Sequence, residues 1–157
     1  STVFGTALNY VACRLLSVDA EHPMLAWSQA TLHSLGKQGY WFLTWGKVCL
    51  SLLNVYNREG VDPITPKIWL LPDVLPFLPW RWWVHSWQVY LPISYISGKR
   101  LRVELNPLLS LLCEKLYTQP YSSINWPSQH NSVLSEDLYC PHHPVADALF
   151  WILGKWE

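Results

Sequence analysis

Charged residues are the most marked shortage in this sequence. Only 14% of the 157 residues are Asp, Glu, Lys or Arg, and eleven of each sign leave no net charge. A chain-wide basic field of the kind that attracts nucleic acid is therefore excluded, and we expect no nucleic-acid partner. An average soluble domain has roughly 25% charged residues, whereas half of this chain is hydrophobic. Such a composition indicates contact with something apolar: a membrane, a lipid-like ligand or the rest of a larger protein.

Paired cysteines and glycine-rich loops are also missing. The cysteines are far apart, which excludes a zinc ribbon or a Cys-x-x-Cys redox motif, and we expect them to be buried, reduced thiols. They are Cys13, Cys49, Cys113 and Cys140. Cys140 with the nearby His142 and His143 provides too few ligands for a metal site, so no metal is expected. No Gly-x-Gly-x-x-Gly loop, Ser-His-Asp motif or paired-carboxylate motif is recognisable.

Tryptophan, by contrast, is abundant, with eleven in the chain. The stretch LPWRWWVHSWQVYLP, residues 78–92, contains four of them together with a tyrosine and a histidine. The uncharged run 82–98 would form a helix of about 25 Å, which is too short to span a hydrocarbon core of about 30 Å. Because Trp and Tyr favour the headgroup region, the stretch predicts a surface that enters one leaflet. The alternative is an aromatic interface inside a protein.

Helical spacing of apolar residues runs through most of the chain, and no window of strand length alternates apolar with polar residues. We therefore predict an all-α fold of packed helical hairpins. Five prolines between Asp62 and Pro79 exclude a regular helix there, so this stretch should be an ordered, aromatic-bearing loop. Residues 122–131 should form a loop or a short helix. The expected helices cover residues 1–18, 23–35, 41–56, 82–95 with a kink or break near Tyr90, 107–117 with Asn106 as N-cap, and 144 onward.

Both ends of the chain have helical character. Ser1 opens a segment with helical spacing, and PVADALFWILGKWE at the other end has a large apolar face. No charged segment followed by an apolar one marks a signal peptide. We expect residues 1–157 to be a single partial domain of a longer protein.

Four stretches of the chain, in this order, resemble a known family. They are STVFGTALNYVACRLL, TWGKVCLSLLNVY, ITPKIWLLPDVLPFLPWRWWVHSWQVYLPISYISGKR and LYTQPYSSINWPSQHNSVLSEDLYCPH. The chain resembles part of the N-terminal half of the oxidosqualene cyclases of the lanosterol synthase type, and its form WRWWVH is similar to the fungal members. The resemblance implies a protein of two α/α barrels, of which this chain would form a segment of one. It also implies an enzyme without a cofactor that cyclises 2,3-oxidosqualene to lanosterol or a related tetracyclic sterol precursor.

The resemblance also implies a mechanism and a location. An aspartic acid protonates the epoxide, and aromatic rings stabilise the carbocations that follow by roughly 0.5–2 kcal/mol each while they exclude water. The expected partners are the isoprenoid substrate, the remainder of the cyclase chain and a membrane surface, bound on one leaflet only. The expected location is the cytosolic face of the endoplasmic reticulum membrane or the surface of a lipid droplet.

Five site residues follow from the resemblance. The family's motif W-C-H-C-R-x-V-Y-L-P-M-S-Y places its active-site histidine on His85 and its first tryptophan on Trp83. The motif S-W-G-K places a cavity tryptophan on Trp45. His85 would orient a hydroxyl or accept a proton late in the reaction, and the two tryptophans would line the cavity. Tyr90 would gate the passage from the membrane together with Ser86.

The sequence also departs from the family's motifs. Val84 and Ser86 replace the two cysteines, and Trp87 replaces the arginine, which would change the size and polarity of the passage. The approach to the S-W-G-K motif, GKQGYWFLT, is bulkier than in the family. The motif D-C-T-A-E, which carries the protonating aspartate, does not occur in these residues. We therefore expect the isolated chain to be inactive.

Alternatives of other classes stay open from the sequence alone. A short relative of a cyclase could act as a non-catalytic membrane-surface or interaction module, and the product of a decaying gene would not fold. His85 in an apolar run is, without the resemblance, ordinarily a neutral, hydrogen-bonded structural residue.

Overall fold

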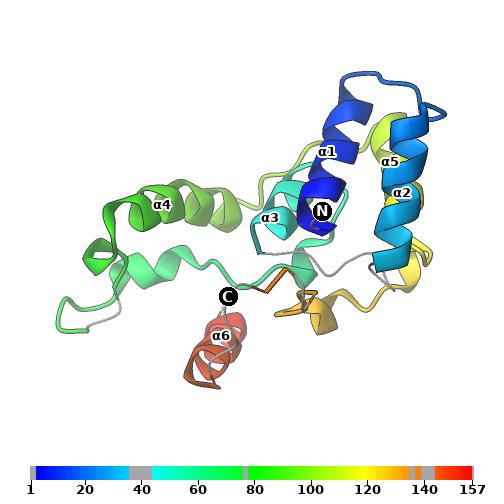
Figure 1. Ribbon diagram of the computed structural model, residues 1–157. Helices are drawn as coiled ribbons and strands as arrows, with labels where there is room; N and C mark the ends of the chain where they lie inside the picture. Colours follow the sequence, from blue (N-terminus) through cyan, green and yellow to red (C-terminus); the bar gives the residue numbers. More distant parts are fainter. Residues whose placement is uncertain (1–2, 36–43, 76–77, 135–136, 139–143, 157) are drawn as a thin grey trace. The chain divides into compact units, whose positions relative to one another are not determined.

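The computed structural model describes residues 3–35, 44–75, 78–134, 137–138 and 144–156. Within these ranges the chain forms six α-helices, five 3₁₀-helices and no β-strand, so the predicted all-α class is confirmed. Membership of an α/α barrel stays a prediction. The α-helices are α1 (Val3–Leu15), α2 (Pro23–Leu35), α3 (Thr44–Leu52), α4 (Val84–Gly98), α5 (Pro107–Leu116) and α6 (Pro144–Trp156) (Figure 1).

The chain divides into two compact units. Unit 1 comprises residues 1–61 and 102–142, and unit 2 comprises residues 62–101 and 143–157. The backbone N–H of Val103 donates a 2.8 Å hydrogen bond to the carbonyl oxygen of Leu52. The two parts of unit 1 that precede and follow residues 62–101 in the sequence are therefore bonded directly to each other. The prediction of one partial domain over the whole chain stays a prediction.

The helical part of unit 1 is a hairpin of α1 and α2 with α5 packed against both (Figure 1). Each helix turns a stripe of apolar residues inward at spacings of three, four or seven, and burial of one such side chain contributes roughly 1.5–3 kcal/mol. The buried residues are Val3, Ala7, Tyr10, Val11, Leu25, Leu32, Leu109, Leu112 and Leu116. Gln29 of α2 donates from Nε2 to the carbonyl oxygen of Lys115 at 3.1 Å, and His33 Nε2 lies 3.0 Å from the same oxygen. These contacts satisfy a carbonyl that the end of α5 leaves without an intrahelical donor.

A second cluster in unit 1 is aromatic. The ring of Trp126 lies 4.7 Å from that of Tyr56, 5.5 Å from that of Tyr117 and 4.9 Å from that of Tyr121, centroid to centroid. Tyr117 is buried, and its hydroxyl donates to the carbonyl oxygen of Val55 at 2.8 Å. Burial, aided by the neighbouring tyrosines, raises the pKa of Tyr117 well above its ordinary value, and burial raises the pKa of Tyr121 to about 12.

One charged side chain is fully enclosed in unit 1. Lys47 on α3 has no exposed surface, and its Nζ donates to the carbonyl oxygen of Gln129 at 2.7 Å. A buried ammonium group is tolerated only where oxygen acceptors replace its water. The lysine of the T-W-G-K stretch thus ties α3 to the 3₁₀-helix Trp126–Gln129.

Several helices end at residues in the left-handed region. Ser17, Asn54 and Arg100 have φ of 64°, 59° and 52°, and the next residue in each case donates its N–H to a carbonyl five positions back. This is the Schellman arrangement. It explains why the predicted helix 41–56 is wrong at its C-terminal end, since α3 stops at Leu52 and the chain reverses at Asn54. Residues 41–43 of that prediction lie outside the described residues.

Of the other expected bounds, the first helix stops at Leu15 rather than residue 18, and α4 covers Val84–Gly98 rather than residues 82–95. The remaining ones are confirmed or differ by one residue. The helix α2 covers Pro23–Leu35 as predicted, and α6 begins at Pro144. The side chain of Asn106 accepts a 2.8 Å hydrogen bond from the N–H of Leu109, as an N-cap should. The stretch 122–131 is short-helical, with 3₁₀-helices at Tyr121–Ser123 and Trp126–Gln129.

Unit 2 is built around α4 and the proline-rich stretch. Two 3₁₀-helices, Pro66–Leu70 and Pro79–Arg81, pack against α4, so the stretch is ordered and free of α-helix in its described residues, as predicted; residues 76–77 lie outside them. The helix continues through Pro92, so a break of α4 near Tyr90 is wrong, whereas a kink there stays a prediction. Pro92 and Gln88 are both exposed, so water can serve the carbonyl that the proline leaves without a donor. Gly98 lets the helix end approach Pro66, since a Cβ there would lie 2.8 Å from the ring.

No helix in the described part of the chain is long and apolar enough to cross a membrane. A surface that enters one leaflet stays a prediction.

The prediction of buried thiols has a mixed outcome. Cys113 is buried, which raises the pKa of its thiol, and Cys13 is partly buried. The prediction is wrong for Cys49, which is exposed because it lies one helical turn after Trp45 on the outer edge of α3. Cys140 lies outside the described residues.

Candidate functional site

Four of the five predicted site residues lie on or beside one helix. Trp83 is the N-cap of α4, His85 and Ser86 are in its first turn, and Tyr90 follows one turn after Ser86. Residues four apart on a helix share a face, so Ser86 and Tyr90 are neighbours along α4. The two residues are thus near enough along the helix to act together. Their role as a gate stays a prediction.

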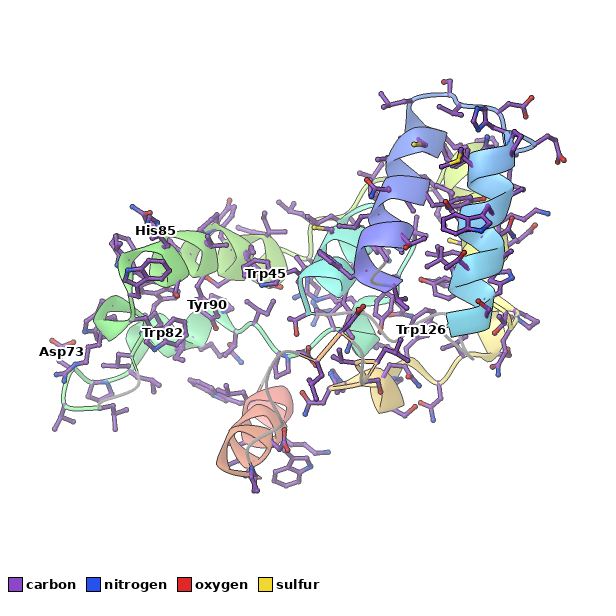
Figure 2. All side chains as sticks on the ribbon, viewed as in Figure 1. Trp45, Asp73, Trp82, His85, Tyr90 and Trp126 are labelled. Carbon is purple, nitrogen blue, oxygen red and sulfur yellow. The ribbon has the colours of Figure 1, made fainter. Side chains whose placement is uncertain are left out.

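Tyr90 lies on the inner side of α4. Its hydroxyl donates to the buried carbonyl of Thr65 at 3.1 Å. Its ring meets that of Trp82 edge-on at 5.1 Å and that of Trp69 in a tilted arrangement at 6.3 Å. Figure 2 shows Tyr90 and Trp82 between the helix and the proline-rich stretch. The edge-to-face pair contributes about 0.5–1.5 kcal/mol beyond its buried area. The hydrogen bond to Thr65 and the contact with Trp69 hold the helix against the stretch.

His85 and Trp83 lie on the other side. The two rings stack edge to face with centroids 4.5 Å apart and an angle of 81° between their planes. Both side chains are exposed, Trp83 by 72%, and Figure 2 shows His85 pointing away from the proline-rich stretch. Ser86 is exposed as well. The imidazole of His85 is thus accessible beside an indole face rather than enclosed as a structural histidine.

Trp45 belongs to the other unit. It lies in the first turn of α3, with 51% of its surface exposed, next to the buried Gly46 and Lys47. Unit 2 therefore brings together Trp83, His85, Ser86 and Tyr90 on one helix, while Trp45 is presented by unit 1. A cavity shared by all five stays a prediction.

The chemistry that these residues offer is limited to aromatic surface, hydroxyl groups and one imidazole. Apart from the imidazole of His85, α4 carries no ionisable Asp, Glu, Lys or Arg side chain. No group of three His, Cys, Asp or Glu side chains that could hold a metal ion is found in the described ranges. An open groove of about 470 Å³ between α1 and α2 is lined by residues such as Cys13, Met24 and Trp27, and contains none of the predicted site residues.

The sequence reasoning missed the residues that hold α4. Trp69 donates from Nε1 to Ser94 Oγ at 3.2 Å, and its ring lies 6.2 Å from that of Trp80. Ser94 is spaced four residues after Tyr90, so the inner face of α4 was recognisable from helical periodicity once the helix was known to run through Pro92. Trp69 stands in one of the motif stretches, but no pattern within the sequence says which face of a helix a loop tryptophan will meet.

Comparison with known proteins decides the family. Residues 1–151 match the family described as squalene-hopene cyclase N-terminal domain. The chain belongs to this family. It is similar to the lanosterol synthase of Candida albicans, with 45% identity over 163 residues that cover 100% of this chain and 22% of that protein. The lanosterol synthase of Saccharomyces cerevisiae is 47% identical over 90% of this chain and 19% of its own length, and the human one is 41% identical over 100% and 21%.

These matches confirm the resemblance on which the site residues rest. The chain spans about a fifth of the length of the curated relatives it matches. Nearly all of this chain, residues 1–151, matches the N-terminal domain of the squalene-hopene cyclase family. The roles of Trp45, Trp83, His85, Ser86 and Tyr90 stay predictions.

Proposed function

We propose that this chain is the segment of an oxidosqualene cyclase that forms the substrate passage and part of the cavity wall. The parent protein would convert 2,3-oxidosqualene to lanosterol or a related tetracyclic sterol precursor, without a cofactor, with its acid supplied by the remainder of the chain. The observation that carries this proposal is the arrangement around α4 in a member of the cyclase family: Tyr90 of the helix pairs with Trp82 on one side, and His85 pairs with the N-cap Trp83 on the other.

The proposed roles follow from the chemistry of these groups. A carbocation over an indole or phenol ring is stabilised by roughly 0.5–2 kcal/mol, and Trp45 and Trp83 would provide such rings. The exposed imidazole of His85 can accept a proton or orient a hydroxyl, since an imidazole has one donor and one acceptor when neutral. Tyr90 and Ser86 would control passage, because Tyr90 can open the inner face of α4 only by releasing its hydrogen bond to Thr65.

The test is product analysis of the full-length protein incubated with 2,3-oxidosqualene. We expect a cyclised triterpene alcohol from the natural protein and a changed product mixture or yield from His85→Ala. The matched control is His130→Ala, an exposed histidine of unit 1 that should leave the products unchanged. An active natural enzyme whose products His85→Ala does not alter would remove His85 from the mechanism. No cyclisation by the full-length protein would favour the non-catalytic module.

We also propose that unit 2 contacts one leaflet of a membrane, at the endoplasmic reticulum or a lipid droplet and from the cytosolic side. Its support is exposed apolar surface: Leu70 is 84% exposed, Val74 82% and Tyr95 60%. Full burial of a Leu or Val side chain contributes roughly 1.5–3 kcal/mol, so a few such residues suffice for surface binding.

Vesicle flotation of the full-length protein tests this surface. The double variant Leu70→Ser, Val74→Ser should bind neutral phospholipid vesicles several-fold more weakly than the natural protein. Leu16→Ser is the matched control, because Leu16 is 79% exposed but belongs to unit 1. Equal binding by all three proteins would exclude Leu70 and Val74 from membrane contact.

A further inference from the structure

A relay of two hydrogen bonds crosses from the proline-rich stretch into α4. The indole N–H of Trp69 donates to Ser94 Oγ at 3.2 Å, and the Ser94 hydroxyl donates to the carbonyl oxygen of Leu91 at 2.9 Å. Ser94 is 1% exposed, so water does not compete for these bonds. A hydroxyl can donate once and accept from others, and this one does both. The relay therefore joins a loop tryptophan to the backbone of α4 through one buried serine.

The relay lies beside the proline of the helix, where one intrahelical hydrogen bond is missing. Leu91 directly precedes Pro92, whose nitrogen has no hydrogen to donate to the helix. On the N-terminal side of the proline, the Tyr90 hydroxyl is bonded to Thr65. On its C-terminal side, Ser94 is bonded to Trp69. The helix is thus attached to the proline-rich stretch on both sides of the residue that weakens it.

Trp69 takes part in both attachments. Its indole N–H bonds Ser94, while its ring lies 6.3 Å from the ring of Tyr90. Trp80 completes the cluster at 6.2 Å from Trp69, but no described residue provides a hydrogen-bond acceptor for its indole. The chain therefore offers two tryptophans in one cluster that differ in whether the indole bonds the helix.

We propose that Trp69 and Ser94 are positioning residues, which fix the inner face of α4 and with it the orientation of Tyr90. Neither residue touches the reacting atoms of the substrate. Their loss should alter how the substrate is admitted rather than the rate at which bound substrate cyclises. This inference rests on the proposed function, in which Tyr90 controls the passage.

Steady-state kinetics of the full-length enzyme test the proposal with Trp69→Phe, Ser94→Ala and their double variant. Each single change removes one partner of the hydrogen bond between the two side chains, and we expect KM for 2,3-oxidosqualene to rise about two- to tenfold with kcat little changed. The double variant should raise KM no further than the larger single change, because both changes remove the same bond. Trp80→Phe, the same substitution in the same cluster, should leave KM unchanged.

Other outcomes would overturn the proposal. A merely structural role would lower the amount of folded enzyme, which reduces the apparent kcat and leaves KM as it was. An equal rise in KM with Trp80→Phe would assign the effect to ring packing. If Tyr90→Ala raises KM while Trp69→Phe and Ser94→Ala do not, this inference fails and the proposed passage stands. If Tyr90→Ala leaves KM unchanged, the proposed passage fails, and this inference with it.

Hydrogen exchange provides a measurement that does not depend on activity. The backbone amides of residues 94–98 should exchange about two- to tenfold faster in Trp69→Phe and Ser94→Ala than in the natural full-length protein, because the attachment beyond Pro92 is lost. The Trp80→Phe control should exchange at the natural rate. Unchanged exchange in the first two variants would show that the relay does not hold the helix.

Discussion

The hydroxyl of Tyr117 offers a direct test of how unit 1 is held together. Tyr117→Phe removes a single oxygen that donates a 2.8 Å hydrogen bond to the carbonyl of Val55, and Val55 is 0% exposed. A buried acceptor that loses its partner costs about 1–3 kcal/mol, because no water replaces the donor. The ring and its contact with Trp126 are retained, so packing should change little. We therefore expect the free energy of opening of unit 1 to fall by about 1–3 kcal/mol.

Native-state hydrogen exchange of the α3 and α5 amides in the full-length protein measures this change. A tenfold change in exchange corresponds to about 1.4 kcal/mol, so these amides should exchange roughly five to over a hundred times faster in the variant. The control is Tyr95→Phe, since Tyr95 is 60% exposed and should contribute less than about 0.5 kcal/mol. Equal exchange in the two variants would refute the reasoning that the buried carbonyl of Val55 depends on Tyr117.

Three further predictions concern stability. Alkaline pH should destabilise unit 1, because the pKa of Tyr117 is raised well above its unfolded value of about 10 and that of Tyr121 to about 12. The contribution is complete below pH 10 and declines as the pH rises toward 12, and urea unfolding at several pH values should show less decline in Tyr121→Phe. Gly60→Ala should lower stability by about 1–3 kcal/mol, because its Cβ would lie 3.0 Å from the Trp126 carbonyl oxygen; an unchanged Tm would argue that the backbone yields. Arg100→Gly should raise stability by up to about 1 kcal/mol, since φ at residue 100 is 52°, and a lower Tm would contradict this account of the helix end.

Helix beginnings were predictable because they depend on local chemistry. Asn106 before Pro107, and prolines at 23 and 144, fix a first turn whatever the rest of the chain does. Helix ends were harder, since α3 stops where Asn54 adopts a left-handed conformation rather than where its apolar spacing stops. The passage of α4 through Pro92 was missed for a related reason: the cost of the proline is offset by a solvated face and by tertiary bonds, which the local sequence does not reveal.

The residues of the candidate site come from motif resemblance and their roles stay predictions, whereas the residues that support them were not predictable from the sequence. Motif resemblance located His85, Trp83 and Tyr90 because the motif is long and keeps its order. It could not show that Tyr90 faces inward while His85 faces outward, because that division depends on which side of α4 meets the proline-rich stretch. Lys47 was overlooked for a similar reason, since a lysine beside a tryptophan in a short motif gives no sign that it is fully buried.

The bond between Val103 and Leu52 has a consequence for how such proteins diversify. In the sequence, residues 62–101 lie between two segments of unit 1 that this bond joins to each other. Residues of such an intervening stretch can be substituted while the flanking unit keeps its own packing, just as insertions at exposed loops are generally tolerated. Val84, Ser86 and Trp87, which depart from the family's motif, all lie within residues 62–101. Changes to the proposed passage would therefore not require the hairpin of α1 and α2 to repack.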